Sequence, residues 1–325
     1  MLATRMAFGN ELLEIAKTDD RFMICNPDTK SCNLENFDQF FPGRSFTFGI
    51  AEQNLVAAAA GAASCGCKVY VPTFSVFLTL RACEQIRTFV CYPRLNVTLL
   101  GTHSGLQVGQ DGGTHICCED VGVMRSLANM TVVQPSDSVT ARAIARWSVG
   151  FEGPLYVRLH RSPVEEVHPE NYEFHFGKAE ILRDYGSDVT LIATGIMLPR
   201  TLHAAEALRE MGIGAKVLEV HTIKPIDTQG VVSAAKATRG VVTVEDHSIF
   251  GGLGSAVAEV LSQHCPTRLK MIGVQDAFGE SAKDPETLYA AHHMTEGIYK
   301  SFGRALRMAA ARSQDGIPSS KGTLL

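Results

Sequence analysis

Short apolar, β-branched or aromatic runs alternate with helix-length segments along almost the whole chain. This is the pattern of parallel sheets flanked by helices. Six runs in the first half are predicted to be strands, at 21–25, 45–48, 68–72, 96–101, 131–134 and 155–159. Four more follow in the second half, at 189–193, 215–220, 240–244 and 269–274, with helical segments at 198–211 and 253–263. We therefore predict an α/β protein with two doubly wound domains, the second one smaller.

The two halves are separated by a polar stretch, 162–178, that has neither a helical nor a strand period. It contains two prolines, four glutamates and two histidines, a composition typical of a linker. A length of 325 residues also suits two domains that each bury a core. The expected division is a first domain at 1–164, a linker at 165–184, a second domain at 185–312 and a flexible tail at 313–325.

Overall composition excludes several classes of protein. The formal charge is −4 and charged residues make up 20%, so no basic stripe of the nucleic-acid-binding kind is indicated. The longest nearly pure apolar run, 55–63, is far shorter than the ~20 residues of a membrane span. The first residues also lack the layout of a signal peptide. A cytoplasmic protein is expected.

Nine cysteines raise the question of a metal site or a disulfide framework. The pairs Cys65/Cys67 and Cys117/Cys118 are too close in sequence for the C-x-x-C pairs of structural zinc sites. A chain of this size also needs no disulfides to be stable. We expect reduced cysteines that are mostly buried as small apolar residues.

Polar and aromatic residues follow the predicted strands where the strands end. Asp28 follows the first, Glu52 the second, Phe74 and Phe77 the third, and His103 the fourth. In open parallel sheets, ligands bind beyond the carboxyl ends of the strands. A ligand site is therefore expected at this edge of the first sheet.

One of these residues, Glu52, stands where a strand runs through Gly49 into an apolar helix. The segment 46–54 reads Phe-Thr-Phe-Gly-Ile-Ala-Glu-Gln-Asn, and the helix continues as Leu-Val-Ala-Ala-Ala-Ala-Gly. Taken alone, Glu52 is a carboxylate at a helix start, which the helix dipole stabilises by ~0.3–1 kcal/mol.

A second segment, 101–115, is rich in glycine and contains His103, Asp111 and His115. Glycine lets the backbone approach a ligand closely, and histidine titrates near neutral pH. A lone histidine in such a place is more often structural, so the loop by itself leaves a binding role open.

Both segments resemble those of the transketolase family, and the resemblance covers nearly all of residues 1–310. The Gly49-Ile-Ala-Glu52-Gln stretch is similar to the family's G-I-x-E segment. The glutamate of that segment bonds a ring nitrogen in the aminopyrimidine of thiamine diphosphate. By this likeness Glu52 shares a proton with the ring and promotes loss of the proton from the thiazolium C2.

The resemblance also implies the other cofactor contacts. Phe77 matches the phenylalanine that packs on the pyrimidine, with Leu80 one turn on and Ile50 in the G-I-x-E segment. The family often has larger aromatic residues at the positions of Leu80 and Cys83, so a looser pocket is expected. Asp28 resembles the aspartate that faces the thiazolium across the subunit interface.

Substrate contacts follow from the same likeness. The spacing of His103, Asp111 and His115 matches the family loop in which the histidines hold substrate oxygens and move protons while the aspartate binds a hydroxyl. Two arginines, Arg5 and Arg161, match the family's phosphate-binding arginines, whose planar guanidinium suits phosphate. The family's phosphate-binding serine falls at Cys32, with Ser31 beside it, so Ser31 is the candidate substrate contact.

The chain lacks one motif of thiamine enzymes, the G-D-G with a downstream asparagine that binds Mg²⁺. No metal site is therefore expected here. We expect a separate diphosphate-binding subunit to hold Mg²⁺ with its oxygen ligands. Two copies of each chain would form a heterotetramer.

Three functions remain open on the sequence alone. The first is the pyrimidine-binding subunit of a split transketolase in carbohydrate metabolism, such as the pentose phosphate reactions. The second is the matching subunit of an enzyme like deoxyxylulose-phosphate synthase or a 2-oxoacid dehydrogenase, and the third is a non-catalytic interaction module. The ketose donor and the aldose acceptor are not indicated.

Two further motifs receive structural interpretations. The glycines at 251–254 lack the third glycine and the downstream acid of a dinucleotide loop, so a tight helix start is predicted. Residues 245–247, Glu-Asp-His, are predicted to form a surface turn after a strand.

Overall fold

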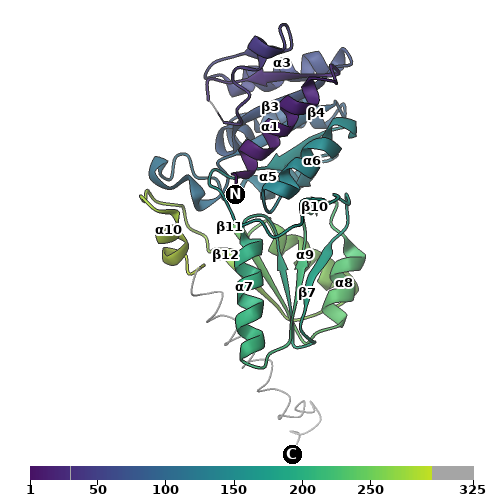
Figure 1. Cartoon of the computed structure of the whole chain (residues 1–325), viewed down its shortest axis with the longest axis vertical. Coiled ribbons are helices and arrows are strands. Elements are labelled where there is room, and N and C mark those ends of the chain that lie inside the picture. Colours follow the sequence, from purple (N-terminus) through teal and green to yellow (C-terminus); the bar gives the residue numbers. More distant parts are fainter. Residues whose placement is uncertain (30, 295–325) are drawn as a thin grey trace, which may run out of the picture.

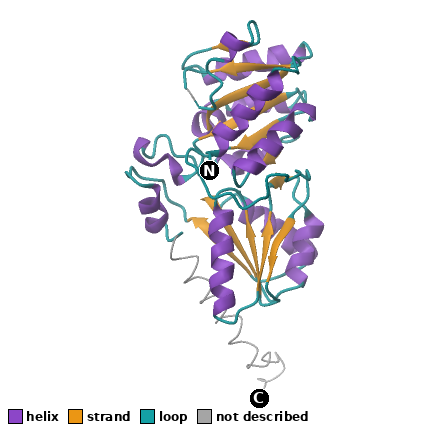
Figure 2. Cartoon of the chain, viewed as in Figure 1, coloured by secondary structure: helices purple, strands orange, loops and turns teal. Residues whose placement is uncertain are grey.

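A computed structural model describes residues 1–29 and 31–294. Two α/β domains lie end to end along the long axis of the molecule (Figure 1). The predicted fold class is confirmed, since each domain has a largely parallel sheet with helices packed on it (Figure 2).

The first domain is built on a seven-stranded sheet. Its strand order is β10-β5-β6-β4-β3-β1-β2, and every pair is parallel except β10 with β5. The strands are β1 (Phe22–Asn26), β2 (Ser45–Thr47), β3 (Lys68–Phe74), β4 (Val97–Thr102), β5 (Thr131–Val133), β6 (Leu155–Arg158) and β10 (Thr222–Lys224).

Helices cover both faces of this sheet because the buried strands are apolar on both sides. In β3, Tyr70 packs into the core beneath α1 (Thr4–Ala16) and α6 (Ser138–Gly150), which pack on each other. Its neighbours Val69 and Val71 point to the opposite core, beneath α3 (Glu52–Ser64). Shorter helices complete the domain: α2 (Phe37–Phe40), α4 (Cys83–Gln85) and α5 (Asp120–Ser126).

The second domain has a five-stranded sheet in the order β12-β11-β8-β9-β7. Its strands are β7 (Glu180–Asp184), β8 (Val189–Ala193), β9 (Ala215–Glu219), β11 (Val241–Ser248) and β12 (Leu269–Val274). Its helices are α7 (Met197–Glu210), α8 (Thr228–Lys236), α9 (Leu253–His264) and α10 (Pro285–Ala291). The helix predicted after the glycines is α9, which begins directly after Gly252.

Two strands escaped the sequence prediction. The last five residues of the expected linker, 165–184, form β7, an antiparallel edge strand of the second sheet, so the linker is shorter than expected. The other strand, β10, follows β9 in the chain but pairs antiparallel with β5 of the first sheet. The two domains are therefore joined by sheet pairing as well as by the linker.

The predicted surface turn at 245–247 is wrong. Glu245, Asp246 and His247 lie within β11 and are buried between the domains, with at most 1% of each residue exposed. Each side chain of the triplet has a hydrogen-bond partner, so the polar residues can continue a buried strand. The expected tail, 313–325, and the end of the expected second domain, 295–312, lie outside the described residues.

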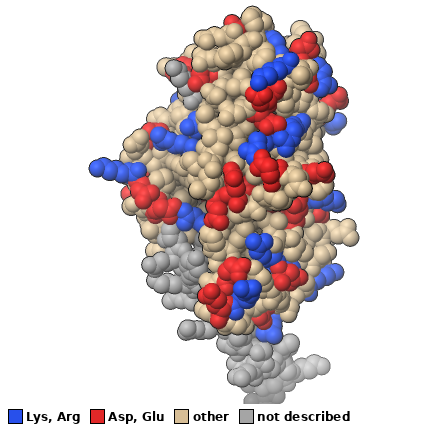
Figure 3. Space-filling model, viewed as in Figure 1, with Lys and Arg blue, Asp and Glu red and all other residues tan. Residues whose placement is uncertain are grey.

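The cysteines have free thiols, and five of the nine are buried, in line with the expectation of reduced, mostly buried side chains. In the described part of the chain, no helix combines the length and the apolar character needed to cross a membrane. On the face drawn in Figure 3, basic and acidic side chains are intermixed over both domains.

Candidate functional site

The candidate site lies at the carboxyl edge of the first sheet. Glu52 follows β2, Phe74 ends β3, His103 follows β4 and Arg161 follows β6. Arg5, in the first turn of α1, reaches the same edge. The topology thus brings together residues that are far apart in the sequence.

The buried carboxylate of Glu52 pairs with Arg81. Gly49 adopts a positive φ of 66°, which only glycine adopts at little cost, and turns the chain from β2 into α3. Glu52 begins α3 with 2% of its side chain exposed, and its Oε2 accepts a hydrogen bond of 2.8 Å from Arg81 Nη1. The guanidinium of Arg81 also lies over the Phe77 ring, with its Cζ 4.4 Å from the ring centroid.

Arg81 and Phe77 come from a π-helical turn, Phe77–Arg81, rather than a regular α-helix. Such turns widen the helix locally and are often found at functional sites. A second π-helical stretch, Ile86–Cys91, follows after α4. The widened turn places Arg81, four residues after Phe77, over the aromatic ring.

Aromatic rings and both histidines of the glycine-rich loop form one cluster. His103 stacks on Phe74 with ring centroids 3.8 Å apart, and Phe74 lies parallel to Phe77 at 5.8 Å. His115 meets the edges of both phenylalanines, at 6.0 and 5.3 Å. The cluster therefore connects the Glu52 region to the predicted substrate loop.

The backbone of His103 has a positive φ of 55°, a conformation that is costly for residues other than glycine and clusters at functional sites. Its Nδ1 lies 3.0 Å from Thr102 Oγ1. Burial, together with the positive charges of Arg5 and Arg161, lowers the pKa of His103 to about 3. His103 is therefore a neutral imidazole at physiological pH, with one ring nitrogen able to accept a hydrogen bond.

The predicted anion-binding residues form a second group beside the histidines. Arg5 donates to the carbonyl of Ser31 at 2.6 Å and to the carbonyl of Arg161 at 3.4 Å. Arg161 donates to the carbonyl of Val108 at 2.6 Å and pairs with Asp111 at 3.1 Å. Two arginines and a loop carboxylate thus converge on the edge of the sheet.

Ser31 and Cys32 have different environments. The Ser31 hydroxyl is buried next to the Arg5 contact and makes no hydrogen bond within the described residues. Cys32 is a core residue, and burial raises the pKa of its thiol to about 12. Its carbonyl packs so closely on Gly9 of α1 that an added Cβ would lie 1.7 Å away. Ser31 is the polar group available here, whereas Cys32 fixes the loop against α1.

The second domain supports the glycine-rich loop. Asp246 of β11 accepts hydrogen bonds from the Leu106 backbone N–H at 3.1 Å and from the Tyr289 hydroxyl at 2.9 Å. Gly105, with φ 69°, lies so close that an added Cβ would be 2.1 Å from the Asp246 carboxylate. Leu106 and Val108 are buried in the core of the second domain. The loop is therefore held by both domains.

A buried ion pair lies beneath this contact. Arg158 donates to the Asp120 carboxylate at 2.8 Å and to the Asp246 carbonyl at 2.9 Å, and the Tyr156 hydroxyl donates to Asp120 at 2.6 Å. Arg158 and Asp120 are both fully buried. Both hydrogen bonds to Asp120 reach the same carboxylate oxygen, Oδ2. Removing either Arg158 or Asp120 would be costly, because the other charge would be left buried without its partner.

Three predicted cofactor contacts are exposed. Ile50 is 78% exposed and Leu80 is 45% exposed, and Asp28 is exposed in the loop after β1. The structure places these residues on loops or turns at the same edge as Glu52 and Phe77. Their roles stay predictions.

Four residues that shape the site have no role predicted from the sequence. Phe74 ends its strand, and its ring stacks on His103. His160 is buried between Gln134 and the Ser104 carbonyl and so fixes the chain next to His103. Arg81 and Asp246 contact residues far away in the sequence, so no local pattern could show them.

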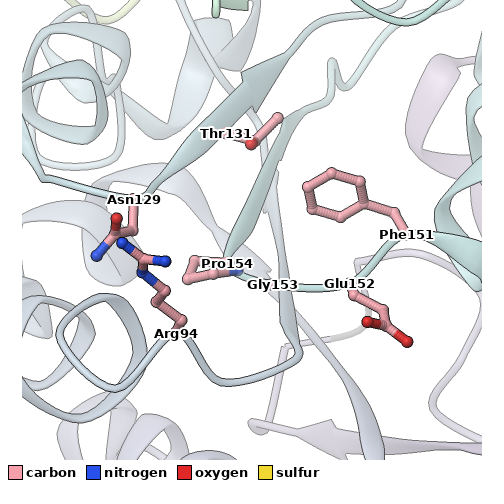
Figure 4. A pocket seen from close by; sticks show the side chains of 7 residues that line it. All are labelled: Arg94, Asn129, Thr131, Phe151, Glu152, Gly153 and Pro154. Atoms are coloured by element: carbon pink, nitrogen blue, oxygen red, sulfur yellow. The ribbon is translucent and has the colours of Figure 1, made fainter.

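Within the described ranges, no group of three or more His, Cys, Asp or Glu side chains is placed to hold a metal ion. A pocket of about 400 Å³ lies at the opposite edge of the first sheet, where β5 and β6 begin (Figure 4). Its lining includes Arg94, Asn129 and Glu152. The predicted site residues are not among those that line it.

Two family models match the chain. Residues 1–166 match the transketolase pyrimidine-binding domain, and residues 177–298 match the transketolase C-terminal domain. The chain belongs to the transketolase family. It corresponds to the pyrimidine-binding and C-terminal domains of a transketolase, as the sequence predicted.

Two relatives that match most of the chain are named as transketolase subunits. One is "6-deoxy-6-sulfo-D-fructose transketolase subunit SqwH" of Clostridium sp. (strain MSTE9), 42% identical over 90% of this chain and 94% of its own length. Another is an apulose-4-phosphate transketolase subunit of Phocaeicola vulgatus, 37% identical over 85% of this chain and 88% of its own length.

A solved structure described as "Split gene transketolase, inactive beta4 tetramer" matches with a TM-score of 0.83. It is 39% identical, and the match covers 95% of this chain and 98% of that chain. Of the functions left open by the sequence, these similarities support the split transketolase subunit.

Proposed function

We propose that this protein is the cytoplasmic pyrimidine-binding subunit of a split transketolase. With a partner subunit that binds the diphosphate and Mg²⁺, it transfers a two-carbon ketol unit from a ketose to an aldose. The observation that carries this proposal is the buried Glu52 carboxylate beside Phe77, at the edge of the sheet where the family's pyrimidine site falls.

The residues at this edge fit an aminopyrimidine ring. A buried carboxylate needs a hydrogen-bond donor, and an aromatic ring offers a face for stacking. Thiamine diphosphate, when bound, supplies a thiazolium carbon that takes up the two-carbon unit. Glu52 would hold the proton shared with the ring nitrogen, and Phe77 would orient the ring.

The histidine cluster would handle the substrate's hydroxyl groups. His103 is neutral because burial lowers its pKa to about 3, so one ring nitrogen can accept a hydrogen bond from a hydroxyl close to the reacting carbon. His115, at the edges of Phe74 and Phe77, lies between this position and the pyrimidine site. Asp111 is available to accept a hydrogen bond from a further hydroxyl.

The arginines favour a substrate that ends in an anionic group. Arg5 donates to the Arg161 carbonyl, and burial together with the positive charge of Arg161 lowers the pKa of Arg5. The buried Ser31 hydroxyl lies beside them. The two named relatives act, by their names, on a sulfonated ketose and on a phosphorylated sugar. A ketose bearing a phosphate or a sulfonate is therefore the proposed donor class.

Reconstitution tests the proposal. The isolated chain is mixed with a diphosphate-binding subunit encoded in the same genome, together with thiamine diphosphate, Mg²⁺ and a panel of ketose phosphates and aldose phosphates. We expect ketol transfer from the mixture and none from the chain alone, because the metal-binding motif is on the other subunit. Tight, Mg²⁺-dependent cofactor binding by the isolated chain in a calorimeter would contradict this division of roles.

A further inference from the structure

Arg81 contacts both groups that the proposed function assigns to the cofactor's pyrimidine ring. It donates to Glu52 Oε2 at 2.8 Å, and its Cζ lies 4.4 Å from the centre of the Phe77 ring. The inference below concerns the same site and rests on the proposed function.

A guanidinium can imitate an aminopyrimidine ring. Both are flat, both offer N–H groups in the plane, and both can stack on an aromatic face. Arg81 directs an in-plane N–H to the carboxylate while its face covers Phe77. These are the two contacts that the pyrimidine needs, so the pyrimidine ring and the guanidinium cannot occupy the position between Glu52 and Phe77 at the same time.

The burial of the two partners is unequal. The side chain of Glu52 is 2% exposed, whereas that of Arg81 is 48% exposed. A buried carboxylate without a partner is costly, so Arg81 stabilises Glu52 as long as no ligand is present. A half-exposed arginine can return to water with its charge hydrated, so it can give way to a ligand.

We propose that Arg81 occupies the position of the aminopyrimidine ring in the cofactor-free chain and moves aside when the cofactor binds. The ring then replaces the guanidinium as the partner of Glu52. The apparent cofactor affinity is the intrinsic affinity multiplied by the fraction of molecules in which Arg81 has left this position. Contacts of the diphosphate with the partner subunit would then supply the free energy that displaces Arg81, which makes cofactor binding depend on assembly.

The test compares variants in the reconstituted complex, with thiamine diphosphate and Mg²⁺ as the probe. Arg81→Met removes the charge and the N–H groups but keeps a chain of similar length. We expect cofactor binding about tenfold tighter by calorimetry, equivalent to about 1.4 kcal/mol. The association rate in stopped-flow measurements should rise by a similar factor with the dissociation rate unchanged, because Arg81 acts before the cofactor is bound.

Two further variants sharpen the comparison. Arg81→Lys keeps the charge but loses the planar fork, so its affinity should lie between those of the parent and of Arg81→Met. Arg87→Met is the matched control, because Arg87 is an exposed arginine in the neighbouring turn, and it should bind like the parent. If Arg81→Met does not fold, as judged by circular dichroism, Arg81→Gln replaces it.

Unchanged or weaker cofactor binding by folded Arg81→Met overturns the inference, because the guanidinium would then be either irrelevant to binding or part of the bound site. Glu52→Gln separates this from a failure of the proposed function. If Glu52→Gln weakens binding while Arg81→Met does not tighten it, only the role of Arg81 is wrong. If the reconstituted complex binds no thiamine diphosphate, the proposed function fails and the inference fails with it.

Discussion

At the scale of single residues, the Glu52 carboxylate has a demanding environment. It starts a helix, it is almost fully buried, and its charged partner Arg81 comes from a π-helical turn. A carboxylate that served only to cap the helix dipole would gain little from such burial. The burial and the adjacent aromatic face are what a proton-sharing group beside a flat ring requires.

Replacing Glu52 by glutamine tests this role. Glu52→Gln keeps the shape of the side chain but removes its ability to take up a proton, so the transfer rate of the reconstituted enzyme should fall by ~10²–10⁴. Deuterium exchange at the thiazolium C2 should slow in parallel, since it precedes sugar binding. Exchange and transfer at nearly the parent rate would mean that Glu52 is only a helix-start carboxylate.

Arg161 provides a test of the anionic substrate. A hydrogen bond to a charged group contributes ~1.5–3 kcal/mol, so Arg161→Gln should raise KM for a phosphorylated or sulfonated ketose by roughly 10–100-fold. KM for an uncharged ketose should change little. Arg146→Gln, on the outer face of α6 in a surface pair with Glu11, is the control. Equal loss with charged and uncharged ketoses would argue against anion binding by Arg161.

At the scale of elements, the glycine-rich loop depends on a strand of the other domain. The Asp246 carboxylate binds the loop backbone at Leu106 and also the Tyr289 hydroxyl. Burial raises the pKa of Asp246, although the nearby Arg158 charge opposes this. Asp246 is therefore a positioning residue for the loop that contains both histidines.

Asp246→Ala should leave the Leu106 N–H and the Tyr289 hydroxyl without a partner. Each unsatisfied buried group costs ~1–3 kcal/mol, so we expect a lower free energy of unfolding in urea and a fall in kcat/KM of about tenfold or more. Asp246→Asn keeps an acceptor oxygen and should restore kcat/KM in part. Lowered stability with an unchanged kcat/KM in Asp246→Ala would reduce Asp246 to a structural residue.

Elements with a strong apolar period were predictable, and those with a weak one were not. The buried strands β3, β4 and β8 lie within a few residues of their predicted positions, because buried β-branched runs have few alternatives. The edge strand β7 has only partly buried or exposed side chains, and β10 has three residues. Neither leaves a periodic signal.

The site was predictable to the extent that its residues follow strands. Strand ends placed Glu52 and His103 at one edge, and the family resemblance supplied their roles and added Arg161. Contacts between segments that are distant in the sequence could not be predicted. Arg81 depends on a π-helical turn that changes the spacing of side chains. Within the buried polar triplet, Asp246 and His247 contact the first domain, at Leu106 and Gly122.

At the scale of the whole molecule, His168 in the linker joins the two domains. Its Nδ1 lies 2.9 Å from Asp137, the N-cap of α6, and its Nε2 lies 2.8 Å from Glu219, the last residue of β9. Burial lowers the pKa of His168, but the hydrogen bonds and charges of the two carboxylates outweigh burial and raise it to about 10. The imidazolium thus ties a helix of one domain to a strand of the other.

Stability should depend on pH through His168. A histidine with a raised pKa contributes stability that is fully present below its unfolded value of ~6.5 and is lost as pH rises towards 10. The difference in free energy of unfolding between the parent and His168→Gln should be on the order of a few kcal/mol at pH 6 and should shrink by pH 10. Urea unfolding at four pH values measures it. A difference that does not change with pH would mean that His168 is not charged in the folded protein.

We predict that the assembled enzyme contains two copies of each subunit, with the proposed cofactor sites at the subunit interfaces. Mass photometry of the reconstituted complex should give the mass of a heterotetramer. A stable complex of one copy of each chain with full activity would contradict this assembly.

The antiparallel pairing of β10 with β5 limits how this polypeptide can be divided. A gene fragment that stops in the linker would leave the edge of β5 bare, with its N–H and C=O groups open to pairing with other chains. Such a fragment would tend to aggregate or exchange strands during expression, whereas the complementary fragment would carry a strand with nothing to pair with. The two domains of this chain are therefore expected to remain on one polypeptide.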